Sequence, residues 1–281
     1  MKKSIITEAI IKQFQAKMTE DEKSEATKEK YTRDIKAFCA FCGENQPTKD
    51  MVIAYKQKLI SDGYAARSVN SMLASLNSLF EFLGWHELHV KSLKIQQQVF
   101  CPEEKEITKN EYERLCHTAQ KRGNERLNLI IQTICGTGIR VSELEFITVQ
   151  TVKKGEAAVS LKGKTRKVFI VRELQKKLLR YIEKNKIKDG AVFRTRTGKP
   201  LCRTEIWREM KAICNDANVN PNKVFPHNLR HLFARVFYEI DKDIAKLADI
   251  LGHSSINTTR IYIVSTGTEH RRRMERMRLI I

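Results

Sequence analysis

The sequence contains no long apolar run. No stretch of its 281 residues approaches the ~20 apolar residues that a membrane-spanning helix needs. The first residues, "MKKSIITEAIIKQ", include lysines but no apolar run long enough for a signal peptide. These absences argue against a membrane or secreted protein, and we expect a cytoplasmic one.

Cysteine is sparse and scattered. The seven cysteines are odd in number, which favours reduced thiols in a cytoplasm over a disulfide framework. Cys39 and Cys42 form a CxxC, but they lie on one face of the amphipathic stretch "YTRDIKAFCAFC", and no second CxxC follows. We therefore predict no metal site. The sequence also lacks a glycine-rich nucleotide loop, an acidic triad, an internal repeat and a low-complexity tract, so we expect no cofactor.

Positive charge is present in large excess. The formal net charge is +19, and the isoelectric point is near 9.7. Residues 1–100 carry 15 Lys/Arg against 12 Asp/Glu, so the remaining residues carry 37 against 21. A charge concentrated in one part of the chain predicts a polyanionic partner, most simply DNA, and a nucleoid-associated protein.

The apolar pattern predicts two domains. Residues 1–95 read as a bundle of four helices, with inward faces such as Ile35–Phe38 and Leu73–Leu76–Leu79. Periodicity is lost over a linker at 96–106, which contains Pro102. A second domain spans 107–281 and opens on a capping box, Thr108 with Glu111. In it we predict a buried helix at "LNLIIQTICGTG", a hairpin at "AAVSLKGKTRKVFIV", and helices at 173–185, 203–217, 227–239, 243–251 and from about 268.

Four polar stretches of the second domain are not explained by packing. They are "GTGIRVSEL" with Arg140, "LKGKTRKV" with Lys162 and Lys164, "PHNLRH" with His227 and Arg230, and "LGHSSINTTRIY" with His253 and Tyr262. Each stretch alone has an ordinary structural explanation, such as a surface ion pair or a solvated turn.

Together these stretches suit phosphoryl transfer. Such a reaction depends on positioning and on neutralising charge on the phosphate oxygens. Arginine can fork onto two of these oxygens, lysine or histidine can protonate a leaving alkoxide, and tyrosine can form a covalent phosphoester. A free phenol with a pKa of ~10 costs roughly 4 kcal/mol to ionise at pH 7, and neighbouring cations can offset part of that cost.

In this order, the four motifs resemble the tyrosine recombinase (phage integrase) family, in its Xer-like two-domain form. The resemblance covers the second domain, and the first looks more weakly like the family's SAM-like core-binding domain. It implies a mainly α fold with a small antiparallel β-sheet: an N-terminal helical bundle and a mixed α/β catalytic domain that form a clamp around DNA.

The resemblance also implies roles for individual residues. Arg140 and Arg230 would hold the scissile phosphate, His227 would give acid/base support, His253 would hydrogen-bond the phosphate, and Tyr262 would attack to give a 3′-phosphotyrosine and a free 5′-hydroxyl. Glu143 would support the site. Around the catalytic lysine the sequence departs from the family pattern, because Leu161 replaces a glycine and the turn is one residue short. Lys162 fits that position best, and Lys164 is the reserve.

Two other functions fit parts of the sequence. "DIAKLADILGHSSINTTRIYI" resembles a helix-turn-helix, as in a non-catalytic DNA-binding regulator. A type IB topoisomerase would use the same chemistry without exchanging DNA partners. The regulator hypothesis leaves Arg140, the hairpin lysines and "HNLRH" unexplained, so we favour site-specific recombination.

The expected partners are double-stranded DNA target sites and further copies of the chain. We expect a tetramer on DNA, assembled through the C-terminal tail 268–281, which is basic and then ends in apolar residues. No further domain precedes the first bundle, which favours a simple-site enzyme of resolution, inversion or integration. Candidate DNA contacts are Tyr64, Arg67, Asn70 and Asn77 in the first domain and Arg203 and Arg208 in the second.

Overall fold

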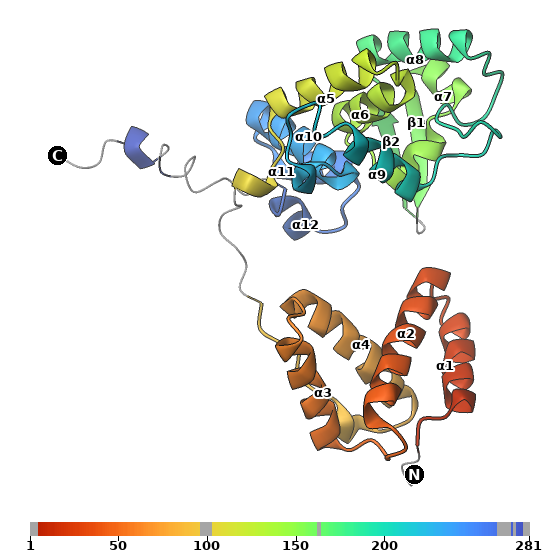
Figure 1. The fold of residues 1–281 in the computed structure, drawn as a ribbon, viewed down its shortest axis with the longest axis vertical. Helices are drawn as coiled ribbons and strands as arrows, with labels where there is room; N and C mark the ends of the chain where they lie inside the picture. Colours follow the sequence, from red (N-terminus) through yellow and green to blue (C-terminus); the bar gives the residue numbers. More distant parts are fainter. Residues whose placement is uncertain (1–4, 96–102, 162–163, 263–270, 272–273, 278–281) are drawn as a thin grey trace. The chain divides into compact units, whose positions relative to one another are not determined.

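The computed structural model describes residues 5–95, 103–161, 164–262, 271 and 274–277 (Figure 1). The chain divides into two compact units, Met1–Gln97 and Gln98–Ile281. The described part is mostly helical with one small antiparallel sheet, which confirms the predicted fold class. None of the described helices combines the length and the apolar character needed to span a membrane.

Unit 1 is a helical bundle. Its helices are α1 (Glu8–Glu20), α2 (Glu25–Cys42), α3 (Lys49–Ser61) and α4 (Ala66–Phe82), followed by the short 3₁₀ turn η1 (His86–Leu88). The first three begin where a hydroxyl side chain, of Thr7, Ser24 or Thr48, accepts a hydrogen bond from a backbone N–H of the first turn. These caps fix the points at which the sequence enters each helix.

The core of unit 1 is built from the apolar faces that the sequence predicts. Ile35, Phe38 and Leu73 are among its fully buried residues. Phe38 makes edge-on contacts with Tyr55 and Phe80, at 5.2 and 6.0 Å between ring centroids. Aromatic pairs in this geometry add to the free energy gained by burying the rings.

Unit 2 contains the remaining elements. They are η2 (Glu103–Lys105), α5 (Lys109–Lys121), α6 (Glu125–Thr137), η3 (Val141–Phe146), α7 (Val149–Lys154), β1 (Glu156–Leu161), β2 (Lys164–Phe169), α8 (Arg172–Lys184), α9 (Arg203–Ala212), η4 (Pro221–Lys223), α10 (Pro226–Asp241), α11 (Ile244–Leu251) and α12 (Ile256–Arg260). The predicted capping box of Thr108 and Glu111 is present at the start of α5. Helix α6 is central, because it packs against α5, α8, α9 and α10.

The sheet of the described part of unit 2 is the predicted hairpin. Strands β1 and β2 pair antiparallel, in a register that runs from Glu156 opposite Phe169 to Leu161 opposite Lys164. Ala157, Val159 and Val168 face the core and are buried. In Figure 1 the hairpin lies between the helices of unit 2, close to α6 and α7.

The prediction of one helix over 203–217 is wrong in its length. Helix α9 ends at Ala212, and a chain of turns follows it. Two arginines bind the carbonyl groups there: Arg122 donates to Ala212, and Arg114 donates to Ala217 and Asn218. The two arginine side chains donate hydrogen bonds to these carbonyl groups. The carbonyls therefore do not need the backbone hydrogen bonds that a longer helix would make.

Candidate active site

The polar stretches singled out in the sequence converge on one region of unit 2. It is formed by the end of α6 with η3, by strand β2, by the start of α10, and by the segment from α11 to α12. Gly138 caps the end of α6 and Gly252 caps the end of α11. Both have a left-handed backbone conformation, with φ of 64° and 66°. Their carbonyl groups accept hydrogen bonds from Arg230 and Arg140 respectively. Two helix ends thereby become acceptors for two guanidinium groups.

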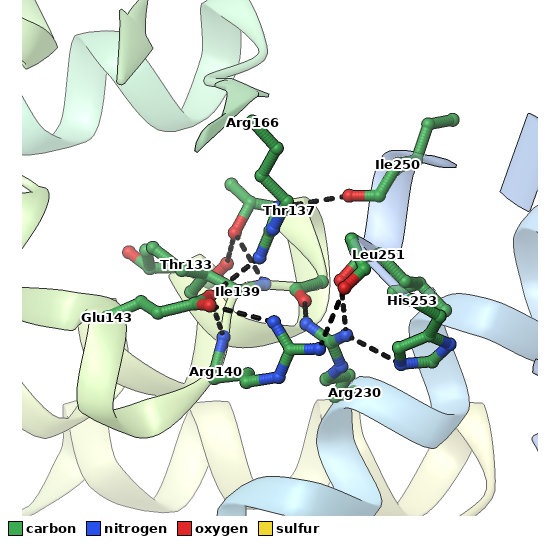
Figure 2. Close-up of polar contacts among 12 residues, drawn as sticks. Thr133, Thr137, Ile139, Arg140, Glu143, Arg166, Arg230, Ile250, Leu251 and His253 are labelled. Carbon is green, nitrogen blue, oxygen red and sulfur yellow. Dashed lines mark hydrogen bonds and ion pairs between the residues drawn. The ribbon is translucent and has the colours of Figure 1, made fainter. Parts of the chain in front are cut away.

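Arg230 is a fully enclosed charged side chain of the cluster, with 1% of its surface exposed. Its guanidinium donates to the carbonyl oxygens of Gly138 and Leu251, the latter at 2.6 Å, and to Nε2 of His253 at 3.0 Å. Figure 2 shows these hydrogen bonds as dashed lines. Burial, with the charge of Arg140 second, lowers the pKa of Arg230 to about 10. The group therefore remains a cation at neutral pH, with a fixed orientation.

Gly138 is required by this arrangement, and we expect Gly138→Ala to lower the melting temperature. A Cβ atom there would lie 2.5 Å from the ring of Phe233 and 3.1 Å from Leu251, on a backbone whose φ of +64° already disfavours a side chain. Gly190→Ala is the matched control, because Gly190 has a similar φ of +72° but no atom within 4 Å of the added carbon. Thermal unfolding compares the two, and an equal loss would contradict the argument from crowding.

Glu143 binds the side chains of both Arg140 and Arg166. This carboxylate is 1% exposed and accepts from Arg140 Nη1 at 2.8 Å, from the Arg140 backbone N–H at 2.9 Å and from Arg166 Nη2 at 2.6 Å. Burial alone would raise the pKa of Glu143, but the bonds from Arg140 and the charge of Arg166 outweigh it and hold that pKa below its ordinary value. Glu143 is therefore ionised and fixes the direction of both guanidinium groups.

Tyr262 lies among three histidines and an arginine. Its ring centroid is 4.2 Å from that of His231, 5.0 Å from that of His253 and 5.4 Å from that of His227. The guanidinium carbon of Arg230 lies 6.0 Å from the same ring. Only 6% of the tyrosine is exposed, and its apolar edge packs on Ala234, Leu247 and Leu251.

The hydrogen bonds of His253 define its tautomer. A guanidinium can only donate, so Nε2 of His253 accepts from Arg230, and the proton resides on Nδ1. Nδ1 then donates to the hydroxyl of the buried Thr259 at 2.9 Å. Burial and the nearby charge of Arg230 lower the pKa of His253 to about 4. His253 is thus neutral at pH 7.

His227 is likewise neutral at pH 7, although its ring faces the surface. The atoms packed around it, with the charges of His231, Arg230 and Arg140, lower its pKa to about 4. A neutral imidazole can accept a proton, whereas an imidazolium cannot. This protonation state fits a residue that receives a proton from a nearby hydroxyl group.

The two lowered pKa values predict that acid destabilises the DNA-free protein. The pKa of His227 and of His253 is about 4 when folded, against 6.5 ordinarily. As the pH falls below about 6.5, the unfolded chain takes up protons that the folded chain does not, so the free energy of unfolding falls. Urea unfolding between pH 7 and 5 should show this slope, and it should flatten in a His227→Asn, His253→Asn double variant. A slope that is equally reduced by His117→Asn, at an exposed site on α5, would contradict this assignment.

Beside the cluster lies a cavity of about 560 Å³. Arg140, His227 and Arg230 line one side of it, and Arg203, Thr204 and Trp207 of α9 line the other. Trp207 is 47% exposed despite its size. The cavity therefore gives an outside group access to both arginines and to His227, next to an aromatic surface.

Of the two hairpin lysines, the structure describes only Lys164. Lys162 lies outside the described residues, and Lys164 begins strand β2. The register pairs Leu161 with Lys164. The choice between the two lysines stays a prediction.

The six candidate DNA contacts fall into two groups. Tyr64, Arg67, Arg203 and Arg208 are exposed. Asn70 and Asn77 instead bind the chain's own backbone: each amide both donates to and accepts from one residue, Leu93 for Asn70 and Val90 for Asn77. These bonds hold the residues that follow η1 against α4, so we do not carry either asparagine forward as a DNA contact.

One group of described side chains could hold a metal ion. Ligand atoms of Glu81, His86 and His89 lie within 4.8 Å of one another. The ion pairs of Glu81 with His86, at 3.1 Å, and with His89, at 3.5 Å, account for this approach. The group belongs to unit 1, and the described residues of unit 2 hold no comparable one.

Sequence reasoning missed three residues of the site: Arg166, His231 and Glu106. Arg166 belongs to the quoted hairpin motif, and His231 is the last letter of "HNLRH", one helical turn after His227. That spacing was the available signal for His231. Glu106 had no local signal, because its partners lie more than 120 residues further along the chain.

Comparisons with known proteins identify the family. A model of the phage integrase family matches residues 105–269, and a model of the phage integrase N-terminal SAM-like domain matches residues 11–87. Tyrosine recombinase XerA of Pyrococcus furiosus is 27% identical, over all of this chain and 98% of that protein.

Solved structures share the fold. The Tn1549 transposon integrase in complex with circular intermediate DNA has a TM-score of 0.75 at 17% identity, covering 95% of this chain and 99% of that one. A lambda integrase tetramer bound to a Holliday junction has a TM-score of 0.73 at 17% identity, covering 90% of this chain and 76% of that one.

The family model covers more than half of the chain, so the chain belongs to the phage integrase family. It is a tyrosine-type, site-specific recombinase, an enzyme that breaks and rejoins DNA. The resemblance read from the four motifs is confirmed. The alternatives, a non-catalytic regulator and a type IB topoisomerase, are not favoured.

Proposed function

We propose that Tyr262 is the nucleophile of this recombinase and that Arg140 and Arg230 bind the scissile phosphate. The phenolic oxygen forms a bond to phosphorus, the bond from phosphorus to the 5′ oxygen breaks, and a 3′-phosphotyrosine and a 5′-hydroxyl result. The observation that carries this proposal is the packing of one buried tyrosine against Arg230, His227 and His253.

The charge of the cluster suits such a transition state. Arg140 and Arg166 bind one ionised carboxylate, Glu143, and Arg230 lies close enough to both arginines to feel their charges. The three arginines and Glu143 together carry two positive charges, and His227 and His253 are neutral. A phosphodiester carries one negative charge, and more charge develops on its oxygens as the tyrosine attacks. Donors fixed in advance stabilise that charge without having to reorganise.

Arg230 also has an N–H group that is available to a phosphate. Its buried Nε has no hydrogen-bond partner among the described residues. A buried, unpaired N–H costs about 1–3 kcal/mol, and a phosphate oxygen in the adjoining cavity would satisfy it. We therefore infer that the non-bridging oxygens enter through that cavity, between Arg140 and Arg230.

The histidines and the hairpin lysine complete the proton transfers. Neutral His227 accepts the phenolic proton. In the tautomer described above, Nε2 of His253 accepts from Arg230, so His253 holds the guanidinium that binds the phosphate and does not itself donate to the phosphate, unlike the role expected from the sequence. We assign protonation of the leaving 5′ oxygen to Lys162, with Lys164 as the reserve. Comparing Lys162→Ala with Lys164→Ala in a cleavage assay decides between them: the variant of the true acid is the slow one.

The partners follow from the chemistry. We propose that the chain acts in the cytoplasm, on the nucleoid, at double-stranded DNA target sites. Tyr64, Arg67, Arg203 and Arg208 are exposed cations and an exposed aromatic ring that suit phosphate and sugar contacts. Alanine variants in a mobility-shift assay test each one.

We further propose a tetramer on DNA that is assembled through the tail 268–281. Most of the tail lies outside the described residues, and its sequence is basic and then ends in Leu279, Ile280 and Ile281. The lambda integrase relative is a tetramer on a Holliday junction. Sedimentation on target DNA, with and without residues 270–281, tests this assembly.

A duplex with a nick close to the cleavage site tests the proposed function, because the cleaved fragment diffuses away and the adduct accumulates. Wild-type protein should accumulate a covalent protein–DNA complex that survives detergent. A regulator would bind the duplex without any adduct. A topoisomerase would form the adduct but would fail to exchange strands between two differently marked duplexes.

A further inference from the structure

Residues 105–107, just before α5, are bound to one face of α10. Asn228 donates to the carbonyl of Lys105 at 2.9 Å, and Arg235 donates to the carbonyl of Ile107 at 2.6 Å. Between these two bonds lies Glu106, which is 8% exposed. Its carboxylate faces Nδ1 of His231 at 3.4 Å and Nε of Arg235 at 3.6 Å. Asn228, His231 and Arg235 share this face because they are spaced by three and four residues.

His231 contacts both Glu106 and the proposed nucleophile, Tyr262. It is bound by Glu106 on one side, and on the other its ring packs against Tyr262 at 4.2 Å between centroids, with an interplanar angle of 42°. This is the shortest of the three ring contacts that histidines make with Tyr262. His231 also lies 4.7 Å from His227.

We propose that Glu106 and His231 are positioning residues for Tyr262, an inference that rests on the proposed function. The carboxylate accepts from Nδ1 of His231 and so holds the imidazole in one rotamer and one tautomer. The imidazole of His231, fixed in this way, provides the surface on which the ring of Tyr262 packs. Neither residue contacts the phosphate in this account; both act through the tyrosine.

The energetics of the site favour a role beyond packing. A carboxylate is costly to take out of water, and Glu106 is 8% exposed, with Nδ1 of His231 at 3.4 Å and Nε of Arg235 at 3.6 Å. An apolar side chain would fill this position at lower cost. The benefit lies in the fixed direction of His231, because a misplacement of about 1 Å at a reacting group can slow a reaction by about 10²-fold.

The test measures the rate of covalent complex formation under single-turnover conditions on the nicked duplex. His231→Ala and Glu106→Ala should each lower this rate by roughly 10- to 100-fold, while the dissociation constant for DNA stays unchanged. The double variant should be no slower than the slower single variant, because both residues act through one tyrosine. The near-isosteric Glu106→Gln, which keeps an acceptor oxygen, should recover part of the rate.

A second substrate separates positioning of the nucleophile from help to the leaving group. Replacing the leaving 5′ oxygen by sulfur removes the need for a general acid, because a thiolate leaves readily without a proton. The defects of the His231 and Glu106 variants should persist on this substrate. Asp34→Asn is the matched control: Asp34 is also a buried carboxylate, 4% exposed, but it pairs with Lys30 and Ser75 in unit 1. Its rate should equal that of wild type.

The possible outcomes separate the two proposals. Wild-type protein without any adduct would contradict the proposed function, and this inference with it. An adduct in wild type, with folded His231→Ala and Glu106→Ala variants reacting at the wild-type rate, would overturn the inference alone. Rate losses that add up in the double variant, or that vanish on the sulfur substrate, would also overturn it. Circular dichroism verifies the folding of each variant.

Discussion

Tyr262→Phe should bind its DNA target with unchanged affinity and form no covalent complex. The substitution removes one oxygen atom and keeps the ring, which packs on His231, His253 and His227. The hydroxyl of Thr259 is buried and bound to Nδ1 of His253, so it does not replace the phenol. Cleavage should therefore fall by at least about 10⁴-fold, as for other enzymes that lose their nucleophile. The assay compares the protein-linked and free DNA on a denaturing gel, using a duplex recovered by covalent capture with the wild-type protein.

Tyr238→Phe provides the matched control for this prediction. Tyr238 lies on α10, is partly buried and packs in the same small apolar cluster as Tyr262. Its loss of a hydroxyl group should leave cleavage at the wild-type rate. Residual adduct in Tyr262→Phe would identify another nucleophile, and loss of DNA binding in that variant would mean that the tyrosine shapes the binding surface instead.

Arg230→Lys should have the second-largest effect. The guanidinium donates at once to the carbonyls of Gly138 and Leu251 and to Nε2 of His253. An ammonium group is a point charge that cannot reproduce this planar set of bonds and still reach a phosphate. Losing one such preorganised donor lowers a catalytic rate by roughly 10²- to 10³-fold. We expect at least that loss in the rate of adduct formation, at saturating DNA.

Stability must be measured beside this rate, because Arg230 is also structural. Arg230→Ala leaves buried acceptors unpaired, at about 1–3 kcal/mol each, and should unfold at a lower temperature than Arg230→Lys. Arg122→Lys is the control, because Arg122, just after α5, also binds a backbone carbonyl but has a side chain that is 41% exposed. An Arg230→Lys variant that is folded and cleaves at the wild-type rate would refute the role given to Arg230.

The sequence predicted the parts of the site that depend on local pattern. Helix periodicity and caps such as Thr108 with Glu111 gave the elements. Arg140, His227, Arg230, His253 and Tyr262 were each found in a stretch whose polar residues a buried core does not need. The structure brings these residues into one cluster around the end of α6 and the start of α10.

Residues whose role depends on a distant partner could not be predicted. Arg166 reads as a solvated charge on a hairpin, and only the fold brings Glu143 to within 2.6 Å of it. Asn70 and Asn77 read as free amides on a helix surface, because their partners lie in a stretch without periodicity, 23 and 13 residues away. The early end of α9 likewise depends on arginines of α5. Helix propensity and periodicity carry no information on such contacts.

The most direct test of the account locates the DNA on the protein. Wild-type protein is incubated with fragmented genomic DNA and quenched with detergent, and the adducts are digested with nuclease and protease and analysed by mass spectrometry. The account predicts a 3′-nucleotide on the peptide that contains Tyr262 and a 5′-hydroxyl on the released strand. A nucleotide on a different residue, or a tyrosine linked to a 5′-phosphate, would contradict it.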